Sequence, residues 1–162
     1  MEDLTRLTAL AGERLRLLGA HLATAESCTG GLIGHLITEV PGSSAYYVGG
    51  VVAYSNEVKV QLLGVRHETL VRHGAVSRET ATEMAQGAQR LFGCEYAVAV
   101  TGIAGPTGGT PEKPVGLTYV AVATPHGVQV KRFVWSGNRS ENKRLSARAA
   151  LELLCACLRN DG

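Results

Sequence analysis

The strongest constraint on the fold is an almost unbroken apolar run from Tyr96 to Thr101. A strand without polar alternation is typical of a sheet that is covered on both faces. An amphipathic helical repeat, Ala81 to Phe92, precedes this run and stops at Gly93, while the segment from Gly102 to Val115 is rich in glycine and proline and indicates a loop. We therefore expect a central strand between two layers of helices.

Short apolar runs alternate with helical repeats over the rest of the chain. This order predicts a three-layer α/β/α sandwich with a mixed, mainly parallel sheet, a C-terminal hairpin and a final helix, in one domain spanning residues 1–162. The other expected strands are His21 to Ala25, Tyr47 to Tyr54, Gly116 to Thr124 and Val128 to Trp135, and the other expected helices are Leu4 to Leu18, Leu32 to Glu39, Asn56 to Leu63 and Arg139 to Leu158.

The charge pattern limits the classes of partner. The 16 basic and 14 acidic residues give a formal net charge of +2, and the basic residues are scattered along the chain. We therefore expect a small-molecule partner and no nucleic acid. The chain has no apolar run of membrane-spanning length, and its first residues do not resemble a signal peptide. We expect a cytoplasmic protein without membrane contact.

Aspartate is almost missing from the chain, because its only two examples, Asp3 and Asp161, lie close to the termini. Unless a glutamate takes the same role, this scarcity argues against a Ser-His-Asp triad and against a magnesium-dependent phosphoryl transferase. The histidines have no zinc-ligand spacing, and the cysteines include no Cys-x-x-Cys pair. We therefore expect reduced thiols, no metal and no cofactor; the cysteines are Cys28, Cys94, Cys155 and Cys157.

The turn after the first expected strand carries a candidate nucleophile. Ser27 stands at the end of that strand, and Thr29, Gly30 and Gly31 follow it where a helix opens. A hydroxyl among free backbone N–H groups suits acyl or phosphate chemistry. Two alternatives stay open: Ser27 or Thr29 caps the helix, or the Cys28 thiol is the nucleophile.

Two further segments also begin where strands end. Lys59 lies one turn into the helix that follows Tyr54 and has valine on both sides, so burial would lower its pKa and let it act as a general base. Thr101 precedes the glycine-rich stretch Gly102 to Gly105, whose N–H groups suit an anion. A solvated lysine and a purely structural loop are the alternatives.

Six motifs together resemble the nicotinamide-nucleotide amidase family, the C-terminal domain of the competence/damage-inducible protein CinA. The resemblance implies hydrolysis of nicotinamide mononucleotide to nicotinate mononucleotide and ammonia without a metal. It extends from about Leu4 to Leu158 and rests on Ala25 to Gly31, Pro41 to Ser44, Tyr54 to Glu57, Gly74 to Ser77, Thr101 to Pro106 and Lys113 to Gly116.

The same resemblance implies roles for single residues. Ser27 corresponds to the nucleophile and Lys59 to its general base, with Tyr54 and Thr101 as polar residues beside them. Arg139 corresponds to a substrate-binding position, and the family's usual aspartate before it is Asn138 here. We expect this change to loosen the orientation of the arginine.

Substrate binding is expected at the two turns. The backbone of Thr29, Gly30 and Gly31 would hold the oxyanion. The phosphate would be bound by an arginine and by the second loop, because the guanidinium group fits phosphate geometry. The candidates for the phosphate are Gly102, Ile103, Ala104, Gly105, Arg139 and Arg144.

The sequence is also compatible with two other functions. One is a non-catalytic nucleotide-binding module with a protein partner in competence or in the response to DNA damage. Another is an amidase with a different substrate. We also expect a homo-oligomer, since most soluble oligomers are built from identical subunits.

Overall fold

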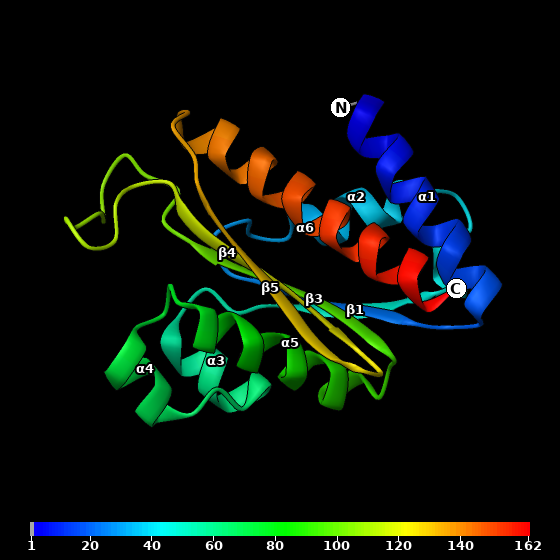
Figure 1. Ribbon diagram of the computed structural model, residues 1–162, viewed down its shortest axis with the longest axis horizontal. Coiled ribbons are helices and arrows are strands. Elements are labelled where there is room, and N and C mark those ends of the chain that lie inside the picture. The colour runs from blue at the N-terminus through cyan, green and yellow to red at the C-terminus, as the bar shows by residue number, and fades with distance from the viewer. Residues whose placement is uncertain (1) are drawn as a thin grey trace.

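The computed structural model describes residues 2–162 and contains a five-stranded sheet between two layers of helices (Figure 1). The predicted α/β/α sandwich is therefore confirmed. No helix within residues 2–162 combines the length and the apolarity needed to cross a membrane. In chain order the elements are α1 (Glu2–Leu18), β1 (Leu22–Glu26), α2 (Leu32–Thr38), the 3-10 turn η1 (Ser43–Ala45), β2 (Tyr47–Val52), α3 (Asn56–Leu63), α4 (His67–His73), α5 (Arg78–Phe92), β3 (Tyr96–Gly102), β4 (Leu117–Thr124), β5 (Gly127–Val134) and α6 (Arg139–Asp161).

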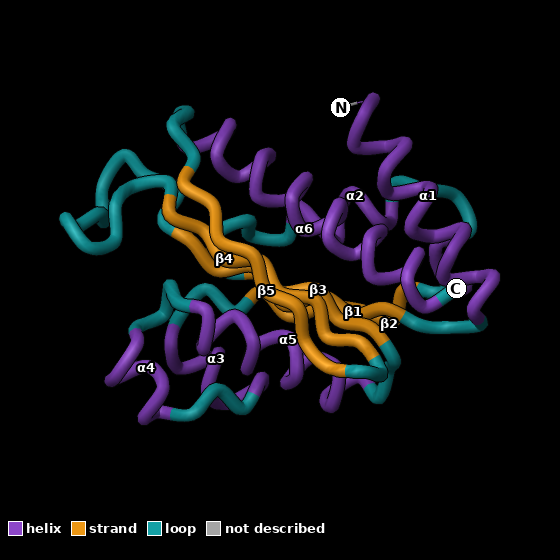
Figure 2. Tube along the Cα trace, viewed as in Figure 1, coloured by secondary structure: helices purple, strands orange, loops and turns teal. Residues whose placement is uncertain are grey.

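The strands form one sheet, which Figure 2 shows between the helices. Its strand order is β2-β1-β3-β4-β5. β1 pairs in parallel with both β2 and β3, whereas β3 with β4 and β4 with β5 are antiparallel pairs. The mixed sheet and its C-terminal hairpin are confirmed. Parallel pairing does not predominate, because two of the four strand pairs are antiparallel.

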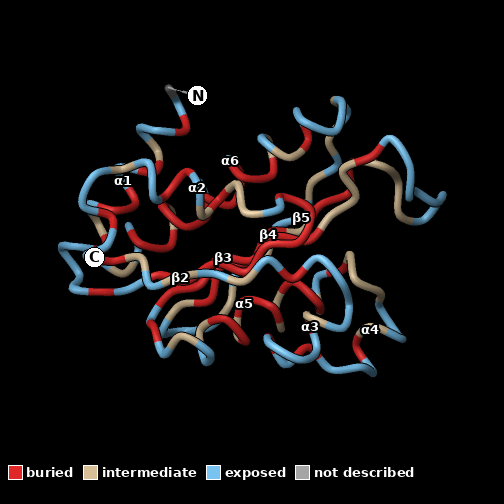
Figure 3. The backbone as a smooth tube through the Cα atoms, turned by 180° about the vertical axis from the view of Figure 1, so that it is seen from behind, coloured by how far each residue is buried: buried red, intermediate tan, exposed pale blue. Residues whose placement is uncertain are grey.

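The two faces of the sheet carry side chains of different size. On β3, Val98 and Val100 face the layer of α1, α2 and α6, while Ala97 and Ala99 face the layer of α5. Figure 3 shows the middle of the sheet buried between these layers. Alanine leaves room for α5 to lie close to the sheet, and the alanine face continues through Ala23, Ala25, Ala121 and Ala123.

Parallel pairing brings the predicted site together. The carboxyl ends of β1, β2 and β3 lie at one edge of the sheet. Ser27 directly follows β1, Tyr54 follows β2 by two residues, and Thr101 is the penultimate residue of β3. Open α/β sheets bind their ligands at such an edge, so the fold places all three segments where a ligand would bind.

The observed elements match the expected ones within three residues, with one omission. The sequence pattern does not predict α4, which buries only Thr69 and leaves Val71 exposed. A helix of seven residues without an apolar stripe gives little periodic signal.

One glycine sets the distance between α3 and α5. A Cβ atom on Gly87 would lie 1.8 Å from the carbonyl oxygen of Leu63, the last residue of α3. The obstacle is backbone, so it has no rotamer by which to move aside. The position of α3, and of Lys59 within it, therefore depends on the absence of a side chain at residue 87.

We expect Gly87→Ala to lower the free energy of unfolding by about 1–3 kcal/mol, because the added methyl group overpacks this contact. In an open helix the same change would stabilise by up to about 1 kcal/mol. Urea denaturation measures the difference, with Gln86→Ala as the control, expected within about 0.5 kcal/mol of the parent. A more stable Gly87→Ala variant would contradict the close contact.

Candidate active site

Ser27 is held against the central strand. Its N–H donates to the carbonyl of Val100 at 3.0 Å, and its own carbonyl accepts a hydrogen bond from Gly30 at 3.1 Å. Gly30 and Gly31 have φ angles of 61° and 105°, in the left-handed region that favours glycine. The glycine pair closes a tight turn and leaves Ser27 8% exposed at the edge of the sheet.

The carboxylate of Glu26 organises this turn and is itself only 2% exposed. Its Oε1 accepts hydrogen bonds from the Thr29 hydroxyl at 2.5 Å and from the N–H groups of Gly31 and Ile33 at 3.2 and 2.9 Å. Its Oε2 accepts from the N–H of Gly34 at 3.0 Å. Glu26 thus satisfies the backbone donors at the start of α2, as a capping side chain does.

These bonds decide which N–H groups remain for an oxyanion. Those of Gly30 and Gly31 are engaged by Ser27 and Glu26, so the expectation that the glycine pair supplies the donors is wrong. Within the backbone of residues 2–162, the N–H groups of Cys28 and Thr29 make no hydrogen bond to another residue. They are the donors that remain beside the Ser27 hydroxyl.

Lys59 reaches Ser27 from the first turn of α3, a helix that Ser55 caps with its hydroxyl. The Nζ atom lies 3.1 Å from the Oγ atom of Ser27. It also donates to the carbonyl oxygens of Ala53 at 2.8 Å and Tyr54 at 3.2 Å. The lysine is 1% exposed, so the alternative of a solvated lysine is wrong.

The surroundings of Lys59 favour a neutral amine. Burial lowers its pKa below the ordinary value of 10.5, because the charged form loses its hydration. No carboxylate among the side chains of residues 3–162 pairs with it. A neutral amine has two N–H bonds, which the two carbonyls take, and one lone pair, which remains for the hydroxyl proton of Ser27. This is the arrangement of a nucleophile and its general base.

Cys28 has the wrong environment for a nucleophile. It is 7% exposed, and burial raises its thiol pKa to about 12. Its Sγ atom lies against Gly102, 3.1 Å from where a Cβ atom would stand. Because the thiolate is the reactive form of cysteine, the structure gives the rival hypothesis no support.

Tyr54 and Arg139 meet at the open side of the site. Tyr54 is 62% exposed, and its hydroxyl accepts a hydrogen bond from Arg139 at 3.1 Å. Arg139 also donates to the carbonyl of Gly105 at 2.7 Å. Asn138 caps α6 in a capping box with Glu141, as an aspartate would. Arg139 is thus held by two hydrogen bonds with asparagine at position 138, and its loosening relative to an aspartate form stays a prediction.

Thr101 faces a different partner from the one that the resemblance implied. It is buried, and its hydroxyl donates to the carbonyl of Ala75 at 2.7 Å. This bond ties β3 to the segment before α5. Among the hydrogen bonds of residues 2–162, none joins Thr101 to Ser27 or Lys59.

The loop after β3 turns its carbonyl groups toward α6. Asn142 donates to the carbonyl of Ala104 at 3.0 Å, next to the bond from Arg139 to Gly105. The N–H of Ile103 is used by the Leu117 carbonyl at 2.9 Å. Within the described chain, the N–H groups of Ala104 and Gly105 form no hydrogen bond and are the ones open to an anion.

The structure separates Arg144 from the other candidates. Arg144 lines a hollow between α1 and α6 together with Asp3 and Glu141. The residue before it, Lys143, faces the site instead, with its Nζ atom 3.8 Å from the position of a Cβ on Gly30. Lys143 is not among the predicted site residues, although its spacing of four residues from Arg139 would place both on one helix face.

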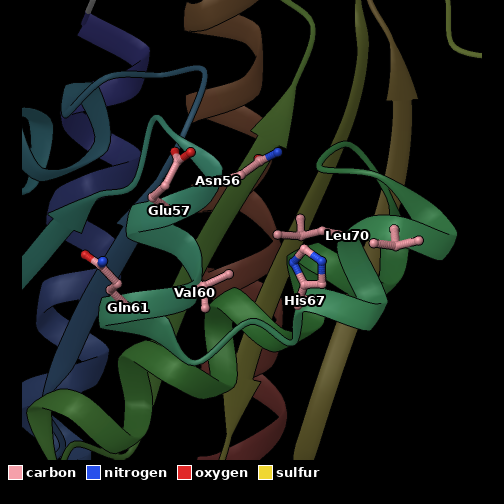
Figure 4. Close-up of a pocket in the computed structure, with 7 residues that line it drawn as sticks. Asn56, Glu57, Val60, Gln61, His67 and Leu70 are labelled. Carbon is pink, nitrogen blue, oxygen red and sulfur yellow. The ribbon is translucent and has the colours of Figure 1, made fainter.

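A second hollow lies between α3 and α4 (Figure 4). Lys59 belongs to the same α3 helix but points to the sheet, so neither it nor Ser27 lines this hollow. We assign it no part in the reaction. Its lining residues are Asn56, Glu57, Val60, Gln61, His67, Leu70 and Val71.

Fold and site together define an α/β domain with a buried serine–lysine contact where parallel strands end. Residues 4–158 match the sequence model described as the CinA C-terminal domain, and the chain belongs to this family. The resemblance that the motifs carried is therefore confirmed.

Both longer proteins and proteins of about this length are similar in sequence to this chain. A CinA-like protein of Syntrophomonas wolfei is 48% identical over 160 residues, which are 99% of this chain and 38% of the relative. The chain thus spans well under half of that longer protein. Nicotinamide-nucleotide amidohydrolase PncC of Escherichia coli K12 is 46% identical over 153 residues, which are 94% of this chain and 93% of PncC.

Solved structures of the family superpose closely. The competence/damage inducible protein CihA from Agrobacterium tumefaciens is similar with a TM-score of 0.94 and 45% identity, over 97% of this chain and 96% of that one. The competence damage-inducible protein A (ComA) from Klebsiella pneumoniae gives a TM-score of 0.93 and 36% identity, over 96% and 97% of the two chains.

We expect Glu26→Gln to lower the free energy of unfolding by about 1–3 kcal/mol, because the amide turns an N–H donor toward backbone donors that need an acceptor. Thermal and urea denaturation would show the loss. Glu39→Gln makes the same chemical change at the exposed end of α2 and should cost less than about 0.5 kcal/mol. Equal stability of the two variants would rule out the capping role of Glu26.

Proposed function

We propose that this chain is an amidohydrolase that converts nicotinamide mononucleotide to nicotinate mononucleotide and ammonia. The observation that carries the proposal is the buried contact of 3.1 Å between Lys59 Nζ and Ser27 Oγ, made without a carboxylate partner in the described chain. The relative PncC, named for this chemistry and matched over 93% of its length, supports the same reaction.

The first step uses the neutral amine of Lys59. Lys59 takes the proton of Ser27 while Oγ attacks the carboxamide carbon, so a C–O bond forms and the carbonyl oxygen becomes negative. The N–H groups of Cys28 and Thr29 would donate to this oxygen. Collapse of the tetrahedral intermediate breaks the C–N bond, and the Lys59 ammonium supplies the proton with which ammonia leaves.

The second step restores the enzyme. Lys59, neutral again, accepts a proton from water as the water oxygen attacks the acyl-serine carbon. The C–O bond to Ser27 then breaks, the proton returns to its oxygen, and the carboxylate product is released. No metal ion takes part in either step.

The substrate itself would assist this mechanism. Its pyridinium ring carries a positive charge next to the carboxamide, which makes the carbonyl carbon more electrophilic. The same charge near Lys59 would disfavour the ammonium form and keep the base neutral. Phosphate binding falls to Arg139 and to the open N–H groups of Ala104 and Gly105, since Arg139 bonds only neutral groups in the described chain.

The proposal includes the setting of the enzyme. Residues 1–162 would act as one amidase domain, in a homo-oligomer. The compartment would be the cytoplasm, where the four free thiols would stay reduced. A non-catalytic nucleotide-binding module is less well supported, because such a module would need neither a buried lysine nor its contact with a serine.

Ammonia release decides between the candidate functions. Assays with nicotinamide mononucleotide, free nicotinamide and NAD compare the proposed substrate with two that carry the same carboxamide. Release from the mononucleotide alone supports the proposal, and release from free nicotinamide at equal efficiency would show an amidase of different specificity. Nucleotide binding without release from any of them would favour the binding module.

We expect Ser27→Ala to lose ammonia release by at least about 10³-fold, while its Kd for nicotinamide mononucleotide stays within a few-fold of the parent. The change removes one oxygen at the reacting centre and little of the binding surface. Cys28→Ala is the matched control at the next position and should keep activity within about tenfold. Substantial turnover by Ser27→Ala, or a loss confined to Cys28→Ala, would overturn the assignment of the nucleophile.

The pH dependence should report Lys59. Only the neutral amine is active, so kcat/KM should fall as pH drops through the lowered pKa of Lys59, with a midpoint below 10.5. Lys59→Arg keeps a positive charge that does not titrate in this range and should be inactive at every pH tested. An unchanged profile in Lys59→Arg would remove the lysine from the mechanism.

A further inference from the structure

Two cationic side chains on α6 face the site without a carboxylate partner. Arg139 bonds the carbonyl of Gly105 and the hydroxyl of Tyr54, both of which are neutral. Lys143 forms no hydrogen bond or ion pair with any described residue. Charged side chains that face a site without counter-ions favour an anionic ligand there.

Lys143 lies close to the turn that contains Ser27 and Gly30. It is half-buried, and its Nζ atom lies 3.8 Å from where a Cβ would stand on Gly30, the residue whose N–H bonds Ser27. Burial is the main influence on the thiol pKa of Cys28 and raises it, while the charge of Lys143 is close enough to lower it. The ammonium group therefore lies over the turn that carries the candidate nucleophile.

Lys143 and Arg144 are consecutive in α6 but point in different directions. Residues four apart lie on the same face of a helix, so Lys143 and Arg139 are adjacent. Arg144 is turned by about 100° from Lys143 and lies in the hollow with Asp3 and Glu141. Two carboxylates thus line the surroundings of Arg144, whereas none pairs with Lys143 in the described chain.

We propose that Lys143 and Arg139 together bind a phosphomonoester dianion, and that this pair makes the enzyme specific for a mononucleotide. The inference rests on the proposed function and names the group by which the substrate is selected. A pyridinium compound without a phosphate is a cation, so the positive charges of Lys143 and Arg139 would repel it. A monoester carries close to two negative charges at neutral pH and offsets both.

The test compares Lys143→Met with Arg144→Met, two variants of similar length at adjacent positions. With nicotinamide mononucleotide, Lys143→Met should raise KM by about 10- to 100-fold and change kcat by less than about threefold, because the charge-assisted hydrogen bond that is lost is made to the phosphate, whose bonds do not change in the reaction. Lys143→Arg should recover most of the loss. Arg144→Met should stay within about twofold of the parent.

A second substrate separates anion binding from a structural effect. Nicotinamide riboside has the same pyridinium carboxamide and no phosphate, so Lys143→Met should leave its kcat/KM unchanged or raise it. The preference for the mononucleotide over the riboside should therefore fall by the full 10- to 100-fold. Equal losses on both substrates, or a larger KM effect in Arg144→Met, would overturn the proposal.

Calorimetry of the binding of inorganic phosphate and of nicotinate mononucleotide tests the anion site separately from the proposed hydrolysis. If the parent protein releases no ammonia yet binds these anions, and Lys143→Met weakens both by at least tenfold, the anion site stands and the proposed reaction fails. If the parent hydrolyses the mononucleotide and Lys143→Met binds both anions as well as Arg144→Met does, the reaction stands and the role of Lys143 fails.

Discussion

The carboxylate of Glu26 is the interaction on which the site depends. It lies at the end of β1 and accepts hydrogen bonds from the Thr29 hydroxyl and from three backbone N–H groups at the start of α2. The N-terminus of a helix ordinarily attracts an external anion. Here an internal anion already occupies it, so the helix holds the serine turn in shape and is closed to a substrate phosphate. That leaves the phosphate to groups on α6 and on the loop after β3.

Two buried ionisable side chains sit on either side of Ser27 without pairing. Glu26 is surrounded by hydrogen-bond donors, and Lys59 has two carbonyl acceptors and a hydroxyl as its partners. A direct ion pair would have stabilised the ammonium form, raised the pKa of Lys59 and left it protonated at neutral pH. Because separate hydrogen-bond partners satisfy each group, Lys59 has a lowered pKa although the buried Glu26 directly precedes Ser27 in the chain. The separation of these two groups therefore supports the proposed role of Lys59 as a base.

The sequence predicted the fold well where local signals agreed. The apolar run of β3 and the stop of α5 at Gly93 both reappear in the structure. Ser27 and Lys59 are 32 residues apart, and parallel strand ends bring them together as expected. The role of Glu26 was beyond prediction because it depends on which backbone groups converge around a buried oxygen. Lys143 was missed for another reason: one residue along a helix changes its direction by about 100°, and motif matching does not fix that phase.

The division of the site between elements has an evolutionary consequence. The proposed nucleophile directly follows β1 and its proposed base lies in α3, which the sheet and the contact at Gly87 hold in place, whereas the cations lie near the start of α6. Substitutions on α6 can thus change which phosphorylated or uncharged amide is accepted while the bond-breaking parts keep their geometry. A family built on this scaffold can diversify its substrates by drift at a few helix positions, with no need to rebuild the hydrolytic centre.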